Sequence, residues 1–498
     1  MIFNNPSYDS LRQFTREMPN AVLTEWENFN IVTHTKARSP QSTYIVEDSN
    51  SSLTTIERNK YERFAQLQDS YLYRNGVIRI DGSIGISPQI QANVSLFIEK
   101  SYPNIAAMQK LLFFSFAGEF KPDFKIIFTP NMPADNWPDN RCILVDLQNY
   151  TTRIAGTDYF GESKKAGLRM WNKWVFNKGG LALHAGCKSY IDDQKKRNSI
   201  IIIGLSGTGK TTTTFTPHSN SQPVQDDFCA LFPGGKIYAS ENGCFAKTFG
   251  LNPEGEPFIY TGLIKRNAWL ENTFVDKKGH VDFNNDTHTT NGRGTFELDT
   301  IPHGNIRDIP PLRMIFILNR NFDILPAIVK LNREQAAAYF MLGETTGTSA
   351  GGTSEAGKAL RIPGTNPFFP MDHASQGNRF LDLLDESPNV AIYLLNTGYI
   401  GGKENPDSSE KITIHHSKKL IESLLKNDLK WEIDDDFIYQ VVTEETSPID
   451  SIFTNPKKLY QRTGRVEGYK EIIKKLILER KDFLLGFKKL NTRIIQAL

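Results

Sequence analysis

The spacing of apolar and polar residues predicts both helices and strands along the chain. Near the start, Leu11, Phe14 and Met18 recur at spacings of three and four, which predicts an amphipathic helix. Short aliphatic runs predict buried strands at residues 125–130, 142–147, 199–203, 314–319 and 390–396. Between the last two runs, the alanine-rich stretch 333–342 predicts a helix. This mixture predicts an α/β protein of the mixed α+β kind.

Charge is nearly balanced over the 498 residues, with 58 Lys and Arg against 56 Asp and Glu. The segment 455–498 is basic, but it also carries apolar residues at helical spacing. That pattern predicts a terminal helix with one packed face and one solvated lysine face. We therefore expect neither nucleic acid nor a membrane surface as a partner.

Cysteine usage and the N-terminal residues indicate the compartment. The four cysteines lie far apart and form no C-x-x-C pair, which argues against a zinc ribbon or a disulfide framework. The opening residues MIFNNPSYDS have neither a basic nor an apolar signal region. The longest aliphatic run, Ile200–Ile203, is far too short to cross a bilayer. We expect a cytoplasmic protein.

A glycine-rich loop directly after the predicted strand 199–203 is the strongest local motif. Residues 204–211 fit the pattern G-x-x-x-x-G-K-[ST], in the strand context that phosphate binding requires. Backbone N–H groups of this loop would cradle phosphate oxygens, Lys210 would contact the β- and γ-phosphates, and the Thr211 hydroxyl would bind Mg²⁺. The pair Asp226 and Asp227 follows along the chain. Adjacent residues of an extended chain face opposite sides, so one carboxylate can reach a metal while the other reaches water or the backbone.

A segment rich in Gly, Ser and Thr at 344–357 follows the predicted helix 333–342. It contains no large apolar side chain and so cannot pack as part of a core. Its composition predicts either a disordered loop or a mobile lid.

Around the glycine-rich loop the sequence resembles the family of ATP-dependent phosphoenolpyruvate carboxykinases. GLSGTGKTT (204–212) is similar to the phosphate loop of that family letter for letter, whereas the GTP-using branch has a different loop. Further stretches resemble family motifs in the same order, and they are ARSPQSTYIV (37–46), GTDYFGESKK (156–165), LHAGC (183–187), ENGCFAKT (241–248), WLENTFVD (269–276), NGRGTF (291–296), ILPAIVKLNREQA (324–336) and LLNTGYIGG (394–402). The resemblance spans residues 37 to about 418.

The resemblance implies two domains with the active site in the cleft between them. An N-terminal α/β domain at 1–178 would lie on the substrate side. A C-terminal, P-loop-containing mononucleotide-binding domain at 179–498 would carry the loop 204–211 and a mobile lid at about 344–362. The implied reaction is the metal-dependent decarboxylation of oxaloacetate with phosphoryl transfer from ATP, which gives phosphoenolpyruvate, ADP and CO₂ in gluconeogenesis. We expect a monomer, and the sequence leaves a homo-oligomer open.

The resemblance also implies a metal site. A catalytic Mn²⁺ would be held by Lys165 as a neutral amine, by His184 and by Asp227, while Thr211 would bind the Mg²⁺ of the nucleotide. Without the resemblance, His184 in its apolar stretch would more often be a core histidine and Lys165 a surface charge. A lysine binds a metal only as the free amine, so burial and the cation must lower its pKa.

Substrate and nucleotide contacts are implied in the same way. Arg38, Tyr159 and Arg293 match positions that bind the carboxylates of oxaloacetate or phosphoenolpyruvate, and planar guanidinium groups suit this task. The implied catalytic residues are Lys164, Lys165, Ser206 and Arg293. Glu271 would hold its neighbours by charge pairing. The residues implied to bind ATP are Gly204, Leu205, Ser206, Gly207, Thr208, Gly209, Lys210, Thr211, Thr212, Lys247, Glu271 and Ser417.

Several positions depart from the family pattern, among them the following four. Gln41 and Ser42 replace a lysine and an aspartate, Phe228 replaces a glutamate, and Lys411 stands where the family has an arginine near the adenine. Two other functions therefore stay open. One is a P-loop kinase with a different acceptor, as in HPr-kinase-like proteins, and the other is a catalytically weak nucleotide-binding paralogue.

Overall fold

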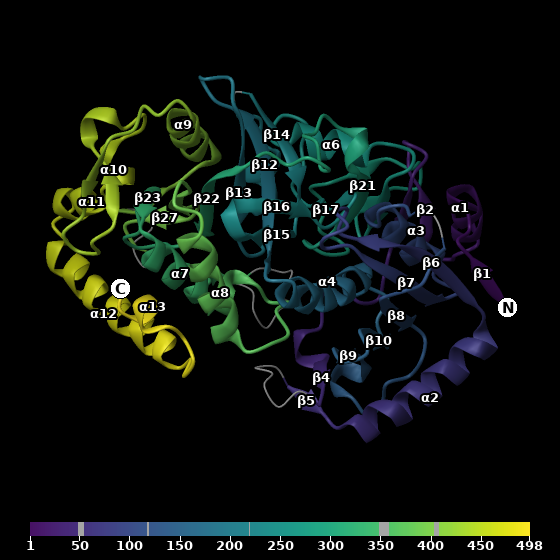
Figure 1. The fold of residues 1–498 in the computed structure, drawn as a ribbon. Coiled ribbons are helices and arrows are strands. Elements are labelled where there is room, and N and C mark those ends of the chain that lie inside the picture. Colours follow the sequence, from purple (N-terminus) through teal and green to yellow (C-terminus); the bar gives the residue numbers. More distant parts are fainter. Residues whose placement is uncertain (48–53, 117–118, 219, 348–357, 403–407) are drawn as a thin grey trace.

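The N-terminal part of the chain folds into an eight-stranded mixed sheet, seen in purple and blue in Figure 1. The computed structural model describes residues 1–47, 54–116, 119–218, 220–347, 358–402 and 408–498. The strands of the first sheet, in spatial order, are β1 (Ile2–Asn4), β6 (Val77–Ile84), β7 (Ala92–Glu99), β8 (Phe124–Thr129), β10 (Thr151–Ala155), β9 (Cys142–Asp146), β4 (Thr43–Val46) and β5 (Thr55–Ile56). Its helices are α1 (Tyr8–Arg16), α2 (Arg58–Asn75), α3 (Pro103–Leu112) and α4 (Phe160–Asn177).

A second eight-stranded sheet carries the glycine-rich loop. Its strands, in spatial order, are β14 (Ser221–Gln225), β12 (Ala185–Ile191), β13 (Arg197–Ile203), β22 (Leu312–Asn319), β26 (Ala391–Asn396), β23 (Ile328–Leu331), β30 (Gln440–Val442) and β29 (Trp431–Ile433). β13, β22 and β26 run parallel to one another.

The sequence of β13 is aliphatic throughout because both faces of this sheet are covered. Ile201 and Ile203 pack in one core with α7 (Arg333–Leu342) and α8 (His373–Asp385). Ile200 and Ile202 pack in another core with α9 (Ile414–Leu425). A continuous apolar run, rather than an alternating one, is what a strand buried on both faces requires.

The remaining strands form smaller sheets. A five-stranded sheet runs in the order β17 (Gly243–Lys247), β21 (Arg293–Glu297), β18 (Trp269–Glu271), β3 (Phe29–Ile31) and β2 (Ala21–Leu23). A three-stranded sheet contains β11 (Leu181–Leu183), β15 (Cys229–Phe232) and β16 (Lys236–Ala239). The paired short strands are β19 (Phe274–Val275) with β20 (Val281–Asp282), β24 (Glu344–Thr346) with β25 (Ala359–Arg361), and β27 (Tyr399–Ile400) with β28 (Glu410–Lys411).

The remaining helices lie in the C-terminal part of the chain, drawn in yellow-green and yellow in Figure 1, except for two that follow the glycine-rich loop in the sequence. These two are α5 (Lys210–Phe215) and α6 (Pro257–Leu263), and the C-terminal ones are α10 (Ser451–Thr454), α11 (Lys457–Arg462), α12 (Val466–Leu485) and α13 (Thr492–Ile495). The buried Tyr469 and Leu484 on α12, beside exposed lysines, confirm the expected terminal helix with one packed face.

The mixed α/β class is confirmed, as are the strands and helices expected from the apolar runs. The division at residue 178 stays a prediction, because β2 and β3 share a sheet with strands from beyond that point. Residues 348–357, the centre of the expected lid, lie outside the described residues. In the part of the chain that is described, no helix is both long and apolar enough to cross a membrane.

Candidate active site

The glycine-rich loop lies between β13 and α5 and has a defined conformation. Gly207 and Gly209 have φ values of 83° and 87°, in the left-handed region that residues with a Cβ atom rarely adopt. The buried hydroxyl of Thr208 donates to the carbonyl of Leu205 at 2.8 Å. Thr397, after β26, donates to the carbonyl of Thr208 at 2.9 Å. The loop is therefore held both by its own contacts and by the residue that follows β26, two strands away from β13 in the same sheet.

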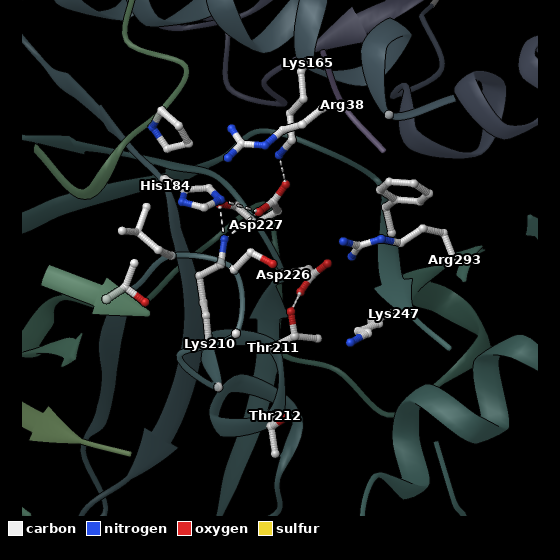
Figure 2. Close-up of a pocket in the computed structure, with 18 of the residues that line it drawn as sticks. Arg38, Lys165, His184, Lys210, Thr211, Thr212, Asp226, Asp227, Lys247 and Arg293 are labelled. Atoms are coloured by element: carbon white, nitrogen blue, oxygen red, sulfur yellow. Dashed lines mark hydrogen bonds and ion pairs between the residues drawn. The ribbon is translucent and has the colours of Figure 1, made fainter. Parts of the chain in front are cut away.

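Asp226 and Asp227 follow β14 and point in different directions. An oxygen of Asp226 accepts a hydrogen bond from the Thr211 hydroxyl at 3.0 Å. An oxygen of Asp227 lies 2.5 Å from Nζ of Lys210. Figure 2 shows these contacts, with Thr211 below Asp226 and Lys210 beside Asp227. Both carboxylates thus meet the end of the glycine-rich loop, one through a hydroxyl and one through an ammonium group.

Asp227 is the centre of a cluster of basic side chains (Figure 2). Lys164 contacts one of its oxygens at 2.9 Å, and Lys165 contacts the same oxygen. Nε2 of His184 lies 3.1 Å from the other oxygen. Burial alone would raise the pKa of Asp227, but the ammonium groups of Lys164, Lys165 and Lys210 outweigh it and hold this pKa well below its usual range. Asp227 is therefore an anion shared by four neighbours.

Lys165 and His184 have the protonation behaviour of metal donors. Burial, together with the neighbouring lysines, lowers the pKa of Lys165 to about 7 and that of His184 to about 3. The rings of Phe228 and Phe368 lie within 5.2 and 5.7 Å of the His184 ring, and Nζ of Lys165 lies 5.0 and 4.4 Å from the same two rings. These apolar walls favour the neutral amine and the neutral imidazole.

These three side chains form a donor set that suits a divalent transition metal: an amine, an imidazole and a carboxylate. Among the described residues, no group of three or more His, Cys, Asp and Glu side chains could hold a metal ion. Lys165 adds a potential nitrogen donor beside Asp227 and His184. Nδ1 of His184 is buried and has no hydrogen-bond partner in the described chain.

Lys164 differs from Lys165 in both position and charge. Its side chain is 1% exposed and lies between Asp227 and Glu241, whose oxygen is 2.9 Å from Nζ. Burial would lower the pKa of Lys164, but the two carboxylates outweigh it and raise this pKa above its ordinary value. Sequence reasoning did not single out Glu241, although it begins the stretch ENGCFAKT that resembles a family motif.

Arg38 and Arg293 approach the cavity from segments that are far apart in the sequence, and Asn291 connects them. Nη2 of Arg293 donates to the side-chain oxygen of Asn291 at 2.9 Å. The side-chain amide of Asn291 donates to the carbonyl of Lys36, two residues before Arg38, at 2.8 Å. Tyr159 lines the same cavity and is 4% exposed. This arrangement places two guanidinium groups and one phenol around a common space.

The loop that presents Arg38 is also fixed from its other side. The carboxylate of Asp158, the residue before Tyr159, accepts the backbone N–H groups of His34 at 2.7 Å and Thr35 at 2.8 Å. The positions of Arg38 and Tyr159 are thereby coupled.

A cavity of about 350 Å³ collects most of the residues expected from the sequence. Those that line it are Arg38, Tyr159, Lys165, His184, Leu205, Ser206, Gly207, Gly209, Lys210, Thr211, Thr212, Asp227, Lys247 and Arg293. Figure 2 shows Arg293 and Lys247 on the far side of Asp226 from His184 and Lys210. Lining residues that sequence reasoning missed include Phe245, Glu256 and Phe368. Glu256 accepts a hydrogen bond from the Thr212 hydroxyl at 2.7 Å.

Five expected residues are not among those lining the cavity: Lys164, Gly204, Thr208, Glu271 and Ser417. Glu271 is fully buried on β18 and accepts the backbone N–H of Phe160 at 2.9 Å, at the start of α4. Burial and the nearby Asp158 raise the pKa of Glu271 to about 8. Ser417 lies on α9.

The departures at Gln41, Ser42, Phe228 and Lys411 have different surroundings. Phe228 is fully buried beside His184. Ser42 is buried and donates to the carbonyl of Pro138 at 3.1 Å. Gln41 and Lys411 are exposed. Only Phe228 therefore touches the proposed metal donors.

Sequence comparison relates the chain to one family of known proteins. The sequence profile of the family described as phosphoenolpyruvate carboxykinase matches residues 1–450. The chain is 30% identical over 427 residues to the phosphoenolpyruvate carboxykinase (ATP) of Aeropyrum pernix, which covers 83% of this chain and 82% of that protein. It is 28% identical over 522 residues to the protein of the same name from Caldanaerobacter subterraneus, covering 100% of this chain and 96% of the relative. To the protein of that name from Campylobacter jejuni the chain is 28% identical over 480 residues, covering 91% of this chain and 89% of the relative.

Proposed function

The chain belongs to the phosphoenolpyruvate carboxykinase family, and from this membership we propose that it converts oxaloacetate and ATP to phosphoenolpyruvate, ADP and CO₂, a step of gluconeogenesis. The observation that carries the proposal is the meeting of three components at one cavity. These are the glycine-rich loop with Lys210, the donor set around Asp227, and the arginine pair Arg38 and Arg293. A plain kinase has no need of the second and third components together.

Arg38, Tyr159 and Arg293 bind the carboxylate groups of oxaloacetate. Each guanidinium can donate two parallel hydrogen bonds to a carboxylate, which fixes its orientation as well as its position. Nε of Arg293 is buried and has no hydrogen-bond partner in the described chain, so this donor is available to an anionic ligand. Asn291 links the guanidinium group of Arg293 to the backbone of Lys36, in the loop that presents Arg38.

Lys165, His184 and Asp227 are the residues that would hold Mn²⁺, and Thr211 would hold the Mg²⁺ of the nucleotide. When bound, Mn²⁺ supplies positive charge that stabilises the negative charge developing on the keto oxygen of oxaloacetate. Because the pKa of His184 is about 3 and that of Lys165 about 7, the imidazole is neutral near pH 7 and a substantial fraction of the Lys165 amine is free to bind a metal. Asp226 orients the Thr211 hydroxyl by accepting a hydrogen bond from it.

The reaction then has two steps. The bond from C3 of oxaloacetate to its carboxylate breaks and releases CO₂, and the electron pair moves to give the enolate of pyruvate. The enolate oxygen attacks the γ-phosphorus of ATP, and the bond to the β-phosphate oxygen breaks to release ADP. The loop N–H groups, Lys210 and Lys247 hold the phosphates, and Arg293 and Lys164 offset the charge of the phosphoryl group in transfer.

We further propose that the site lies between a substrate domain at 1–178 and a nucleotide domain at 179–498. In support, the cavity draws Arg38, Tyr159 and Lys165 from the first part and the glycine-rich loop from the second. The two parts also share one sheet, in which β3 pairs with β18.

Formation of phosphoenolpyruvate from oxaloacetate tests the proposal. The purified chain is incubated with oxaloacetate, Mn²⁺ and Mg²⁺ and with either ATP or GTP, and phosphoenolpyruvate is measured directly. We expect product with ATP and much less with GTP. ATP cleavage without phosphoenolpyruvate would identify a kinase with another acceptor, and ATP binding without turnover would identify a nucleotide-binding paralogue.

A further inference from the structure

A two-stranded ribbon forms part of the wall of the active-site cavity. β24 pairs with β25 in antiparallel register, with Glu344 opposite Arg361. Thr345 and Gly347 line the active-site cavity. Glu344 and Arg361 line a second cavity of about 900 Å³ behind the ribbon. The ribbon therefore separates the active site from a space bounded by the C-terminal helices.

The base of this ribbon is anchored by one buried arginine of α12. Arg480 is 2% exposed, and its guanidinium binds both carboxylate oxygens of Glu344, with Nε at 2.9 Å and Nη2 at 2.8 Å. Its Nη1 donates to the hydroxyl of Tyr339 on α7 at 3.2 Å. Arg361, on the partner strand, contacts Glu344 at 3.2 Å. Both strands of the ribbon thus meet one carboxylate, and Arg480 ties that carboxylate to α12 and α7.

The position of Glu344 in the chain makes this anchor effective. α7 ends at Leu342, the φ of 49° at the next residue, Gly343, turns the chain, and a Cβ at Gly343 would lie 1.8 Å from the carbonyl oxygen of Ile362. Glu344 is the next residue and begins β24. Glu344 directly precedes Thr345, which lines the cavity wall, so a shift of the Glu344 backbone moves that wall.

A buried ion pair of this kind contributes orientation more than stability. Apolar side chains of similar volume generally stabilise a fold as well or better, because they avoid the desolvation of two charges. A bidentate arginine–carboxylate pair instead fixes both distance and angle. This geometry is what a cavity wall requires if it must stay in one position.

We propose that Arg480 is a positioning residue for the active site: by holding Glu344 it keeps Thr345 and Gly347 at the cavity wall, in the conformation that binds substrates. The proposal rests on the proposed carboxykinase function for its kinetic consequence. It also gives a role to α12, which lies beyond the residues 1–450 matched by the family profile.

Loss of the anchor lowers the fraction of molecules whose ribbon is in the binding conformation. Apparent dissociation constants rise in inverse proportion to that fraction. Ground state and transition state are affected equally, so KM rises while kcat changes little. A purely structural role would instead reduce the amount of active enzyme, which lowers kcat and leaves KM unchanged.

The test uses Arg480→Met combined with Glu344→Gln, because this double variant leaves no unpaired buried charge and should fold. Arg493→Met is the matched control, since Arg493 on α13 binds Asp385 at 2.7 Å but does not contact the ribbon. The first measurement is hydrogen exchange of the Gly347 and Ile362 amides, which donate to Lys358 at 2.8 Å and Gly343 at 3.1 Å. The second is the pair of kinetic constants for oxaloacetate and ATP.

We expect exchange of both amides to become at least tenfold faster in the double variant, and at least one KM to rise at least fivefold with kcat within twofold. The control should match the wild type in both measurements. Unchanged exchange in the folded double variant would overturn the anchor, and faster exchange with unchanged KM would overturn its role in positioning. If the wild type forms no phosphoenolpyruvate, the proposed function is wrong, and the positioning role is tested by the dissociation constant for ATP, measured by calorimetry. An increase of at least fivefold in the double variant is then expected, and an unchanged dissociation constant would overturn the positioning role.

Discussion

Nζ of Lys210 lies 2.5 Å from a carboxylate oxygen of Asp227, 17 residues later in the chain. Lys210 ends the glycine-rich loop, and Asp227 is the carboxylate at which Lys164, Lys165 and His184 meet. One ion pair therefore joins the proposed phosphate site to the proposed metal site.

The first prediction concerns Lys210. Lys210→Ala should reduce ATP-dependent turnover by at least about 100-fold, because it removes a preorganised cation from the phosphates. The fold should persist, since Asp227 keeps Lys164 and Lys165 as partners. Steady-state kinetics and circular dichroism check both statements, with the exposed Lys196→Ala as control. A Lys210→Ala variant with normal turnover would remove the phosphate-loop assignment.

The second prediction separates charge from metal binding at Lys165. Lys165→Arg keeps a cation but cannot become a neutral donor, so the Mn²⁺ concentration for half-maximal activity should rise at least tenfold, about 1.4 kcal/mol. Asp227→Asn should have an effect of the same size or larger. Mn²⁺ titrations measure both, with Lys173→Arg on the same helix α4 as the matched control. Wild-type behaviour of Lys165→Arg would show that the lysine is not a ligand.

The third prediction concerns the amide that connects the two arginines. Asn291→Ala removes the contacts to the Lys36 carbonyl and to Arg293, so the KM for oxaloacetate should rise about tenfold, about 1.4 kcal/mol. The KM for ATP should change far less, because the loop contacts are untouched. The exposed Asn284→Ala serves as control. Equal increases in both KM values would indicate general damage to the site rather than loss of carboxylate binding.

Elements set by local pattern could be predicted from the sequence. The aliphatic run of β13 indicates a strand buried on both faces, and the alanine-rich stretch 333–342 coincides with α7. The capping box of Asn332 and Gln335 explains where that helix begins. In each case the information lies within a few residues of the element itself.

Contacts between distant segments could not be predicted in this way. Phe368 lies 4.4 Å from Nζ of Lys165, yet nothing in the local sequence of either residue indicates the other. The pairing of β3 with β18 and the pair Glu344 with Arg480 are of the same kind. The resemblance to a family supplied the roles of Arg38 and Arg293, but the amide of Asn291 that joins them became visible only in the structure.

The fourth prediction follows from a buried lysine outside the cavity. Nζ of Lys188 lies 3.2 Å from the carbonyl oxygen of Thr213, 2.5 Å from that of Thr216 and 2.8 Å from Nδ1 of His218. Burial lowers the pKa of Lys188 to about 7, from 10.5. Between these values the unfolded chain binds a proton that the folded chain does not, so this group makes stability rise with pH across that window, by up to about 1.4 kcal/mol per pH unit.

Thermal unfolding of Lys188→Met at pH 7.5, 8.5 and 9.5 checks this statement. The midpoint of the variant relative to the wild type should be highest at pH 7.5 and should fall steadily towards pH 9.5, because only the wild type gains stability from this group. The exposed Lys236→Met should run parallel to the wild type. A Lys188→Met curve that is also parallel would show that Lys188 is charged in the folded protein throughout this range.

The stoichiometry of a single reaction mixture tests the central claim most directly. With oxaloacetate, ATP, Mn²⁺ and Mg²⁺, the release of CO₂ and the formation of ADP and phosphoenolpyruvate are measured together over time. If decarboxylation and phosphoryl transfer occur in one cavity, CO₂, ADP and phosphoenolpyruvate should form in equal amounts. In the Arg293→Met variant, all three should be lost together. CO₂ without phosphoenolpyruvate, or ADP without CO₂, would contradict the coupling of the two steps at this site.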